Sequence, residues 1–99
     1  MLADPVPIEP GPDPVPRYEL LEGETLRMAF ARWAERERCE LVWLAKIDYP
    51  VIVGAVIDAD SLPVAIAKAL LPVWNTRRPL IAEPSPSDGG CPVVVREKP

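Results

Sequence analysis

The sequence predicts an α+β domain whose elements follow the order strand, helix, strand, strand, helix, strand, strand. Two segments place apolar residues at helical spacing, and each begins at a residue that can cap a helix. Five short apolar segments, rich in valine, isoleucine and leucine, lie between turn residues and are typical of strands. The chain has 99 residues, enough for one domain, and six of its 14 prolines fall in residues 1–16. We therefore expect a Pro-rich flexible tether over residues 1–16 and a folded domain over residues 17–97.

The tether is predicted from residues 4–16, DPVPIEPGPDPVP, where proline recurs at every second or third position. Proline fixes φ and lacks an N–H, so this stretch cannot join a helix or a central strand. We expect it to be disordered and extended, as polyproline-like linkers are. It is either a passive spacer or a ligand for a groove in a partner. Pro7 and Pro10 fit a PxxP pattern, but in so proline-dense a run the pattern has little specificity.

The first half of the domain begins with a strand at Arg17–Leu21, which the pair Glu22-Gly23 ends. Thr25 is a good N-cap for an amphipathic helix over Leu26–Arg38. Trp33 lies on the apolar side of this helix, and we expect it in the core. The next strand, Cys39–Ala45, carries Trp43, which fits either the core or an interface. The apolar side of the helix consists of Leu26, Ala29, Phe30, Trp33 and Ala34.

The continuous apolar run Val51–Ile57 predicts a strand that is covered on both faces, because a strand with one wet face would alternate. A second helix is expected to start at Ser61, with Pro63 in its first turn. Pro72 should end or kink it near Leu70–Leu71, since the residue before a proline disfavours helical geometry. This helix is apolar nearly all round, which indicates either burial on more than one side or a face offered to a partner.

The last two strands are predicted at Leu80–Ala82 and Cys91–Arg96, after a basic loop at Asn75–Pro79. The turn Pro84–Gly90 separates them. Pro92 places the start of the final strand at an edge or at an irregular position. We therefore expect Cys91–Arg96 to be an exposed strand edge that a partner could extend.

Charge and residue content exclude several classes of function. The net charge is −4, of which the tether accounts for −3, and the remainder has 11 basic and 12 acidic residues. Such a domain has no positive field to attract nucleic acid. The chain contains no histidine, the commonest general acid or base and metal ligand, and no nucleotide-binding, hydrolase or zinc motif. We therefore expect no enzymatic activity, no metal or cofactor, and no small-molecule substrate.

Location is less constrained by the residues alone. No apolar run approaches the roughly 18 residues of a membrane span, and the start MLADPVP is not a signal peptide. The protein is therefore either cytosolic or a mature fragment to which Met1 was added. Cys39 and Cys91 lie 52 positions apart. They are either two small, partly buried thiols or a disulfide formed in an oxidising compartment.

An ordered set of short segments resembles the C-terminal domain of the toxin-coregulated pilus biosynthesis protein Q family, over roughly residues 18–96. The family pattern reads G-x-T-L-R, W-A, V-W and D-Y-P, and all four segments occur here in that order. Two further pairs open the second helix, and a valine run closes the domain. The matching residues are Glu22–Arg27, Trp33-Ala34, Leu41-Val42-Trp43, Asp48-Tyr49-Pro50-Val51, Ser61-Leu62, Ala65-Ile66 and Val93-Val94-Val95.

The resemblance implies a fold like the N-terminal domain of outer-membrane secretins and the signalling domain of TonB-dependent transporters, with two helices packed between two small sheets. It also implies a periplasmic role in type IV pilus, conjugative pilus or secretion systems, by docking on a secretin or another envelope subunit. No catalytic residue can be carried over. Any membrane anchor would lie in a segment outside this chain. The alternative function is a cytosolic or plasmid-encoded regulatory binding module.

A small mixed domain recognises protein either through a strand edge or through an apolar helix face. Val93 and Val95 would lie on one side of the predicted edge. Val64 and Leu71 lie on the second side of the apolar helix, and Trp74 lies past the proline break. The predicted partner-binding residues are therefore Val93, Val95, Val64, Leu71 and Trp74.

Overall fold

A computed structural model describes residues 3–5, 17–85 and 90–99 of the chain. The tether predicted over residues 1–16 falls almost entirely outside these residues, so it stays a prediction. The same is true of residues 86–89, which form most of the predicted turn between the last two strands.

The order of elements agrees with the prediction from the sequence. Two α-helices and five strands follow one another as expected, and a short 3-10 helix, η1, comes directly after the second α-helix. The elements are β1 (Arg17–Leu20), α1 (Leu26–Arg36), β2 (Leu41–Trp43), β3 (Ala55–Asp58), α2 (Leu62–Leu70), η1 (Leu71–Val73), β4 (Leu80–Pro84) and β5 (Val93–Glu97).

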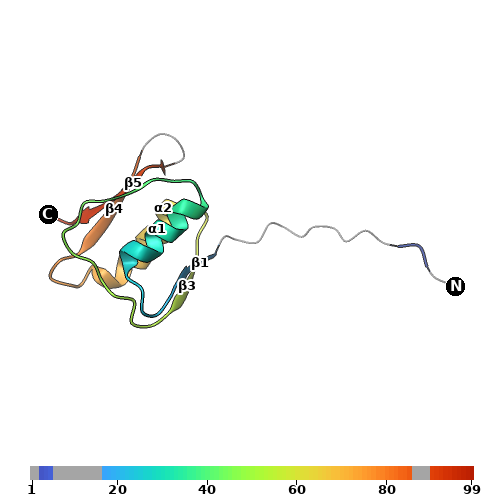
Figure 1. Cartoon of the computed structure of the whole chain (residues 1–99), viewed down its shortest axis with the longest axis horizontal. Coiled ribbons are helices and arrows are strands. Elements are labelled where there is room, and N and C mark those ends of the chain that lie inside the picture. Colours follow the sequence, from blue (N-terminus) through green and yellow to red (C-terminus); the bar gives the residue numbers. More distant parts are fainter. Residues whose placement is uncertain (1–2, 6–16, 86–89) are drawn as a thin grey trace.

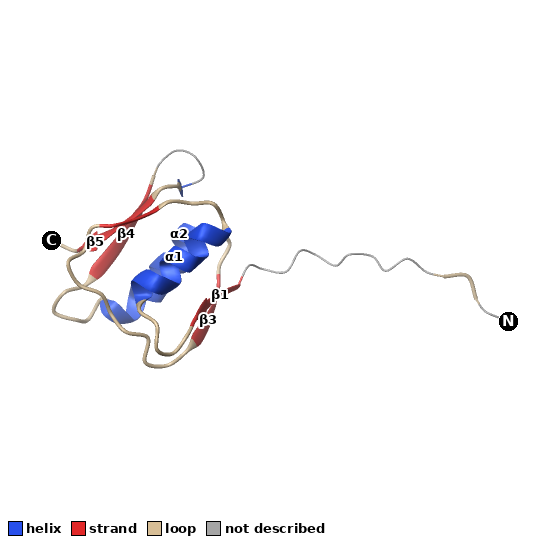
Figure 2. Cartoon of the chain, in the orientation of Figure 1, coloured by secondary structure: helices blue, strands red, loops and turns tan. Residues whose placement is uncertain are grey.

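The strands form two separate sheets, with the helices between them (Figures 1 and 2). One sheet pairs β1 with β3 in antiparallel fashion. The other has the order β2-β5-β4, in which β5 runs parallel to β2 and antiparallel to β4. Helix α1 packs on β1 and β2, and α2 packs on β3 and β4. The predicted α+β class, with two helices packed between two small sheets, is therefore confirmed.

Aromatic side chains form the centre of the core. Trp33 is completely buried, as expected, and its ring lies 5.2 Å from the rings of both Tyr18 and Phe30. Trp43 is half-buried and packs at 6.3 Å from Phe30, which joins the larger sheet to α1. Burial of side chains of this size contributes most of the hydrophobic stabilisation of so small a domain.

The helix starts agree with the prediction better than the helix ends. The Thr25 hydroxyl accepts a hydrogen bond from Met28 N–H, as an N-cap should. Helix α1 ends at Arg36 and not at Arg38, because Arg38 adopts a left-handed φ of 55° that turns the chain toward β2. Ser61 occupies the N-cap position of α2 without a side-chain hydrogen bond, and α2 ends at Leu70, as the proline break predicts.

The prediction for Val51–Ile57 is wrong in two respects. Only Ala55–Asp58 forms a strand, and the run is not covered on both faces. Val51 is buried, whereas Ile52 and Val53 are 71% and 78% exposed. An uninterrupted apolar run therefore reflects here a loop that exposes apolar side chains, and not a strand with two dry faces.

The prediction of an exposed edge at Cys91–Arg96 is also wrong. Strand β5 lies between β2 and β4, so both of its edges are paired. Val93 and Val95 are completely buried in the core. Pro92 sits just before the first paired residue, Val93, so the ladder needs no N–H from it.

Cys39 and Cys91 form a disulfide with a Cα–Cα distance of 5.5 Å. This decides between the two alternatives that the sequence left open. Cys39 follows the turn at the end of α1, and Cys91 precedes β5. The bridge therefore ties the end of α1 to the start of the central strand.

Candidate docking surface

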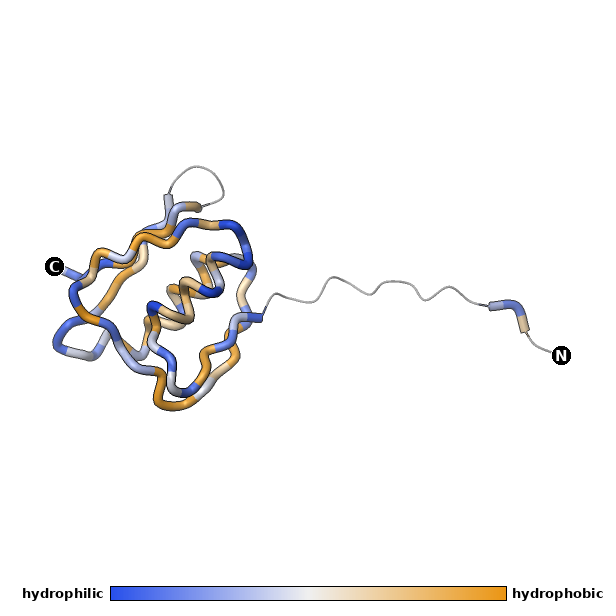
Figure 3. Tube along the Cα trace, viewed as in Figure 1, coloured by the Kyte–Doolittle hydropathy of each residue, from blue (hydrophilic) through white to orange (hydrophobic). Residues whose placement is uncertain are grey.

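Three exposed apolar side chains lie close together in the segment after Val51 and in β3. Ile52, Val53 and Val56 are 71%, 78% and 58% exposed. Figure 3 shows this segment as a continuous hydrophobic stretch at the lower rim of the molecule. We call these three residues the β3 apolar cluster. Exposed apolar patches of this kind mark interaction sites more often than isolated exposed residues do.

Backbone hydrogen bonds from the β1–α1 turn hold the cluster in place. Gly23 N–H donates to Val51 O at 3.1 Å, and Val51 N–H donates to Glu24 O at 2.7 Å. The two bonds clamp Val51 from both sides and keep its side chain in the core. The chain bends directly after Val51, at Ile52 and Val53, and leaves both of these side chains in solvent.

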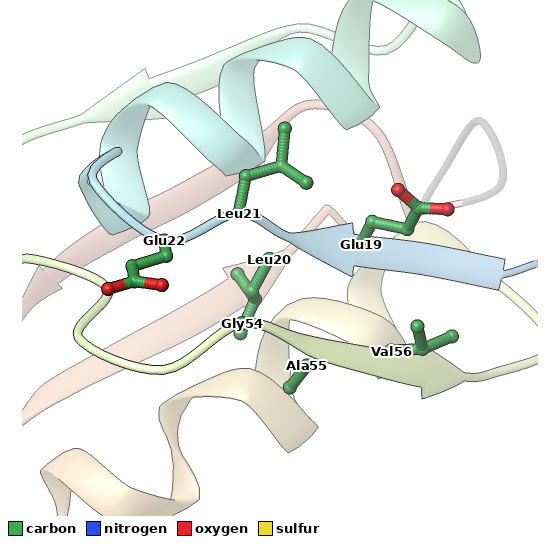
Figure 4. Close-up of a pocket in the computed structure, with 7 residues that line it drawn as sticks. All are labelled: Glu19, Leu20, Leu21, Glu22, Gly54, Ala55 and Val56. Carbon is green, nitrogen blue, oxygen red and sulfur yellow. The ribbon is translucent and has the colours of Figure 1, made fainter.

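A first hollow of about 370 Å³ lies on the solvent side of β1 and β3 (Figure 4). Glu19 and Val56 oppose each other in the register of the two strands, and their side chains rise on the same face. At Gly54, a Cβ would lie 3.1 Å from Leu20 O, so glycine allows the close approach of the two chains there. The hollow is lined by Glu19, Leu20, Leu21, Glu22, Gly54, Ala55 and Val56.

A second hollow of about 260 Å³ lies between the segment 49–53 and the end of α2 with η1. Ile52 and Val53 line it on one side, and Pro72 and Val73 on the other. Its base is fixed by Tyr49, whose hydroxyl donates to Arg78 O at 2.7 Å and lies 3.0 Å from the Thr76 hydroxyl. The hollow is thus apolar on its walls and large enough for one or two apolar side chains.

Three of the predicted partner-binding residues lie at the surface. Val64, Leu71 and Trp74 are 42%, 57% and 55% exposed. Val64 and Lys68 lie one turn apart on α2, and Leu71 follows in η1. The Lys68 ammonium group donates to Asp58 O at 2.8 Å. Trp74 is partly covered by Lys98, whose ammonium lies 5.5 Å from the ring centre. That these three residues bind a partner stays a prediction.

The remaining two predicted residues, Val93 and Val95, cannot offer their side chains to a partner, because they are buried in the middle of the larger sheet. The sequence interpretation missed the β3 apolar cluster instead. A signal for it was present. Pro50 and Gly54 bracket the apolar residues Val51–Val53, and both residue types favour loops over strands.

Ion pairs lie at both sheets, with Arg17 and Asp58 paired at 3.7 Å across β1 and β3, and those that shift a carboxyl pKa lie at the larger sheet. The Arg96 guanidinium binds Glu83 across β4 and β5 and holds the pKa of that carboxyl below its usual value. Arg78 does the same for the pKa of Glu97. These are structural ion pairs between neighbouring elements. In residues 3–5, 17–85 and 90–99, no three acidic or cysteine side chains cluster in a way that could hold a metal ion.

The fold and this surface define a small α+β domain with an exposed apolar cluster. The family model for toxin co-regulated pilus biosynthesis protein Q matches residues 16–82. The chain belongs to this family and is therefore associated with pilus biosynthesis. The family is not known as an enzyme family. No curated protein and no solved structure matches the chain. In its described part, no helix is long and apolar enough to cross a membrane.

Proposed function

We propose that this domain is a non-catalytic docking component of a type IV or conjugative pilus, or of a related secretion system, and that it binds a secretin or another envelope subunit during assembly. The β3 apolar cluster is the observation that carries the proposal. Ile52, Val53 and Val56 stay in water in the isolated chain, although a partner surface could bury them. At roughly 25 cal/mol per Å² of apolar area removed from water, burying side chains of this kind favours association.

The two hollows support a protein partner over a small ligand. Both are shallow, and their walls come from backbone turns and aliphatic side chains. A small ligand would need convergent polar groups to fix its orientation. Within the described residues, Glu19 and Glu22 are the charged side chains in the first hollow and the second hollow has none. Apolar side chains of a partner fit this chemistry.

The disulfide supports the periplasm as the compartment. Disulfides such as Cys39–Cys91 persist in oxidising compartments and are rare where thiols are kept reduced. A cytosolic regulatory module, the alternative function, would carry the two residues as free thiols. Alkylation of intact cells, followed by mass measurement of the chain, distinguishes the two. A bridged chain supports the envelope role, and free thiols contradict it.

Binding of the full chain to the periplasmic domains of its cognate secretin, measured by titration calorimetry, tests the proposal. Val53→Glu places a charge in the cluster and should weaken binding at least tenfold. Met28→Glu is the matched control, because Met28 is 58% exposed, lines neither hollow and occupies the third position of α1, where glutamate is favourable. Leu71→Glu and Trp74→Glu extend the test to the residues predicted from the sequence.

Two results would contradict the proposal. The first is equal binding of the Val53→Glu and Met28→Glu variants. The second is the absence of binding to the secretin and to every other envelope subunit of the same machine. A circular dichroism melt checks that weak binding by Val53→Glu does not come from unfolding. Val53 is 78% exposed, so we expect its melting temperature to be unchanged.

A further inference from the structure

We propose that the domain self-associates through the open edge of β2, so that two copies join their larger sheets into one continuous sheet. The inference is independent of the secretin docking proposed above and uses a different face of the molecule. It starts from a comparison of the four outer strand edges, since an open edge can pair with another chain.

Two of the four edges are blocked by side chains. On β1, the outward carbonyl of Glu19 accepts hydrogen bonds from Arg32 at 2.7 Å and from the Trp33 indole at 3.0 Å. On β3, the Asp58 carbonyl accepts from the Lys68 ammonium at 2.8 Å. All three bonds come from side chains of α1 and α2, so an added strand would have to displace them.

The sequence of β4 makes its outer edge a poor partner for an added strand. Strand β4 ends at Pro84, which has no N–H to donate, and α2 packs against the strand. Natural proteins protect sheet edges by such means. The fourth edge, that of β2, has neither a proline nor a side chain bound to its outward carbonyls in the part of the chain that the structure describes.

The pairing of β2 with β5 shows which groups stay open. Val93 N–H donates to Glu40 O at 3.0 Å, and Leu44 N–H donates to Val95 O at 2.8 Å. In a parallel ladder, this pattern turns the N–H and C=O of Leu41 and Trp43 away from β5. Neither residue's backbone has a hydrogen-bond partner on that side within the described residues. Four strong backbone groups therefore face outward in a row.

The edge runs on past β2 as far as Lys46, where the chain bends. From Cys39 to Val51, side chains on odd positions are buried or half-buried, and most of those on even positions are exposed. Lys46 N–H points to the β5 side, at 3.4 Å from the Glu97 carboxylate, so the backbone groups of Ala45 face outward like those of Trp43. In Figure 1 this green segment follows the outline of the molecule on the side away from the N-terminus.

The solvent-facing side chains of this edge are complementary to themselves. They read Glu40, Val42, Leu44 and Lys46, with Leu44 62% exposed. In an antiparallel pair of two copies centred on Trp43, Glu40 faces Lys46 of the second copy and Val42 faces Leu44 of the second copy. By symmetry each pair occurs twice. Neither Glu40 nor Lys46 forms a salt bridge within the described part of its own chain.

The charged side chains also favour this strand register over the one shifted by one residue. A pair centred on Val42 would oppose Lys46 to Arg38 of the second copy, and like charges directly opposite each other destabilise a sheet. The register centred on Trp43 places the outward backbone groups of Leu41 opposite those of Ala45 of the second copy. Open hydrogen-bond groups, apolar contacts and opposite charges thus coincide in one arrangement.

Sedimentation equilibrium of the full chain over a concentration series tests the inference. We expect a reversible dimer. Glu40→Lys alone and Lys46→Glu alone should each raise its dissociation constant at least about tenfold, since every attractive pair becomes repulsive and occurs twice. The double variant E40K/K46E restores opposite charges across the interface, and we expect it to recover dimerisation.

Recovery of dimerisation in the double variant would distinguish the proposed β2 interface from any other dimer interface. All three variants change exposed side chains, so loss of folding is not expected, and circular dichroism checks it. Val53→Glu should leave the dimer unaffected, because Val53 lies outside this edge. The inference is overturned by a chain that stays monomeric at millimolar concentration, by single variants that dimerise normally, or by a double variant that fails to recover. None of these results bears on secretin binding.

Discussion

The indole nitrogen of Trp33 donates a 3.0 Å hydrogen bond to the backbone carbonyl of Glu19. One side chain thus anchors the core of α1 and covers the outer edge of β1 at the same time. The same carbonyl also accepts from Arg32, whose guanidinium is fixed in turn by Glu24 at 2.8 Å. The smaller sheet has only two strands, and an isolated pair of strands is marginally stable in water. Its stability therefore depends on α1.

Replacing Trp33 by phenylalanine should destabilise the domain by about 1–3 kcal/mol, because it removes the hydrogen bond to Glu19 O and leaves a space in the core. Urea unfolding followed by circular dichroism measures the change. Trp74→Phe is the control, since Trp74 is 55% exposed and should change the free energy of unfolding by less than about 0.5 kcal/mol. Equal stability of both variants would show that the Trp33 bond contributes nothing.

Reduction of the Cys39–Cys91 bridge should lower the free energy of unfolding by about 4 kcal/mol. The bridge closes a loop across 52 positions and restricts the unfolded chain accordingly. Urea unfolding with and without reductant measures the loss. In the C39S/C91S variant, reductant should have no effect. A wild-type midpoint that does not move with reductant would contradict the stabilising role of the bridge.

Alkaline pH should destabilise the fold through Tyr18. Burial raises the pKa of Tyr18 to about 12, above the ordinary value of 10.0. Between these two values the unfolded chain has released the proton and the folded chain has kept it, so the free energy of unfolding falls as pH rises. Below pH 10 this contribution to stability is fully present. Unfolding midpoints from pH 8 to pH 12 measure the decline.

Tyr18→Phe removes the titrating group and should flatten that decline, while Tyr49 stays in both proteins. At neutral pH the same variant should be at least as stable as the wild type. The Tyr18 hydroxyl is buried and has no hydrogen-bond partner among the described residues, and removing an unpaired polar group relieves its desolvation cost. A steep alkaline loss that persists in Tyr18→Phe would assign the effect to other groups.

The N-caps of α1 and α2 should differ in their contributions to the free energy of unfolding. Thr25→Ala removes the hydrogen bond to Met28 N–H and should cost about 1 kcal/mol. Ser61→Ala should cost less than about 0.5 kcal/mol, because the Ser61 side chain makes no cap hydrogen bond. Thermal unfolding of the two variants under one buffer condition gives the comparison. A larger cost at Ser61 than at Thr25 would contradict the cap geometry.

The order of elements could be predicted from the sequence because it depends on local features. Thr25 begins α1, Pro72 stops α2, and the periodicity of α1 places Trp33 in the core. Each of these signals acts within a few residues of its own position. The family could be predicted for a similar reason, since its short segments occur in a fixed order along the chain.

The errors concern features that depend on distant partners. Whether β5 is central or at an edge depends on β2, which precedes it by about 50 residues and pairs with it in parallel. The exposure of Ile52 and Val53 depends on the clamp that Gly23 and Glu24 place on Val51. An apolar run has the same sequence pattern whether it is buried or exposed to solvent, so periodicity alone could not locate the β3 apolar cluster.

The place of β5 in the larger sheet also constrains when that sheet can form. It is the last strand along the chain, yet it lies between β2 and β4 and provides all of their pairing. Because β2 and β4 do not pair with each other, neither strand has a partner until β5 is in place. The larger sheet therefore cannot close until residues 93–97 are available. This half of the domain therefore cannot close strand by strand in sequence order, because its central strand comes after both of the strands that pair with it.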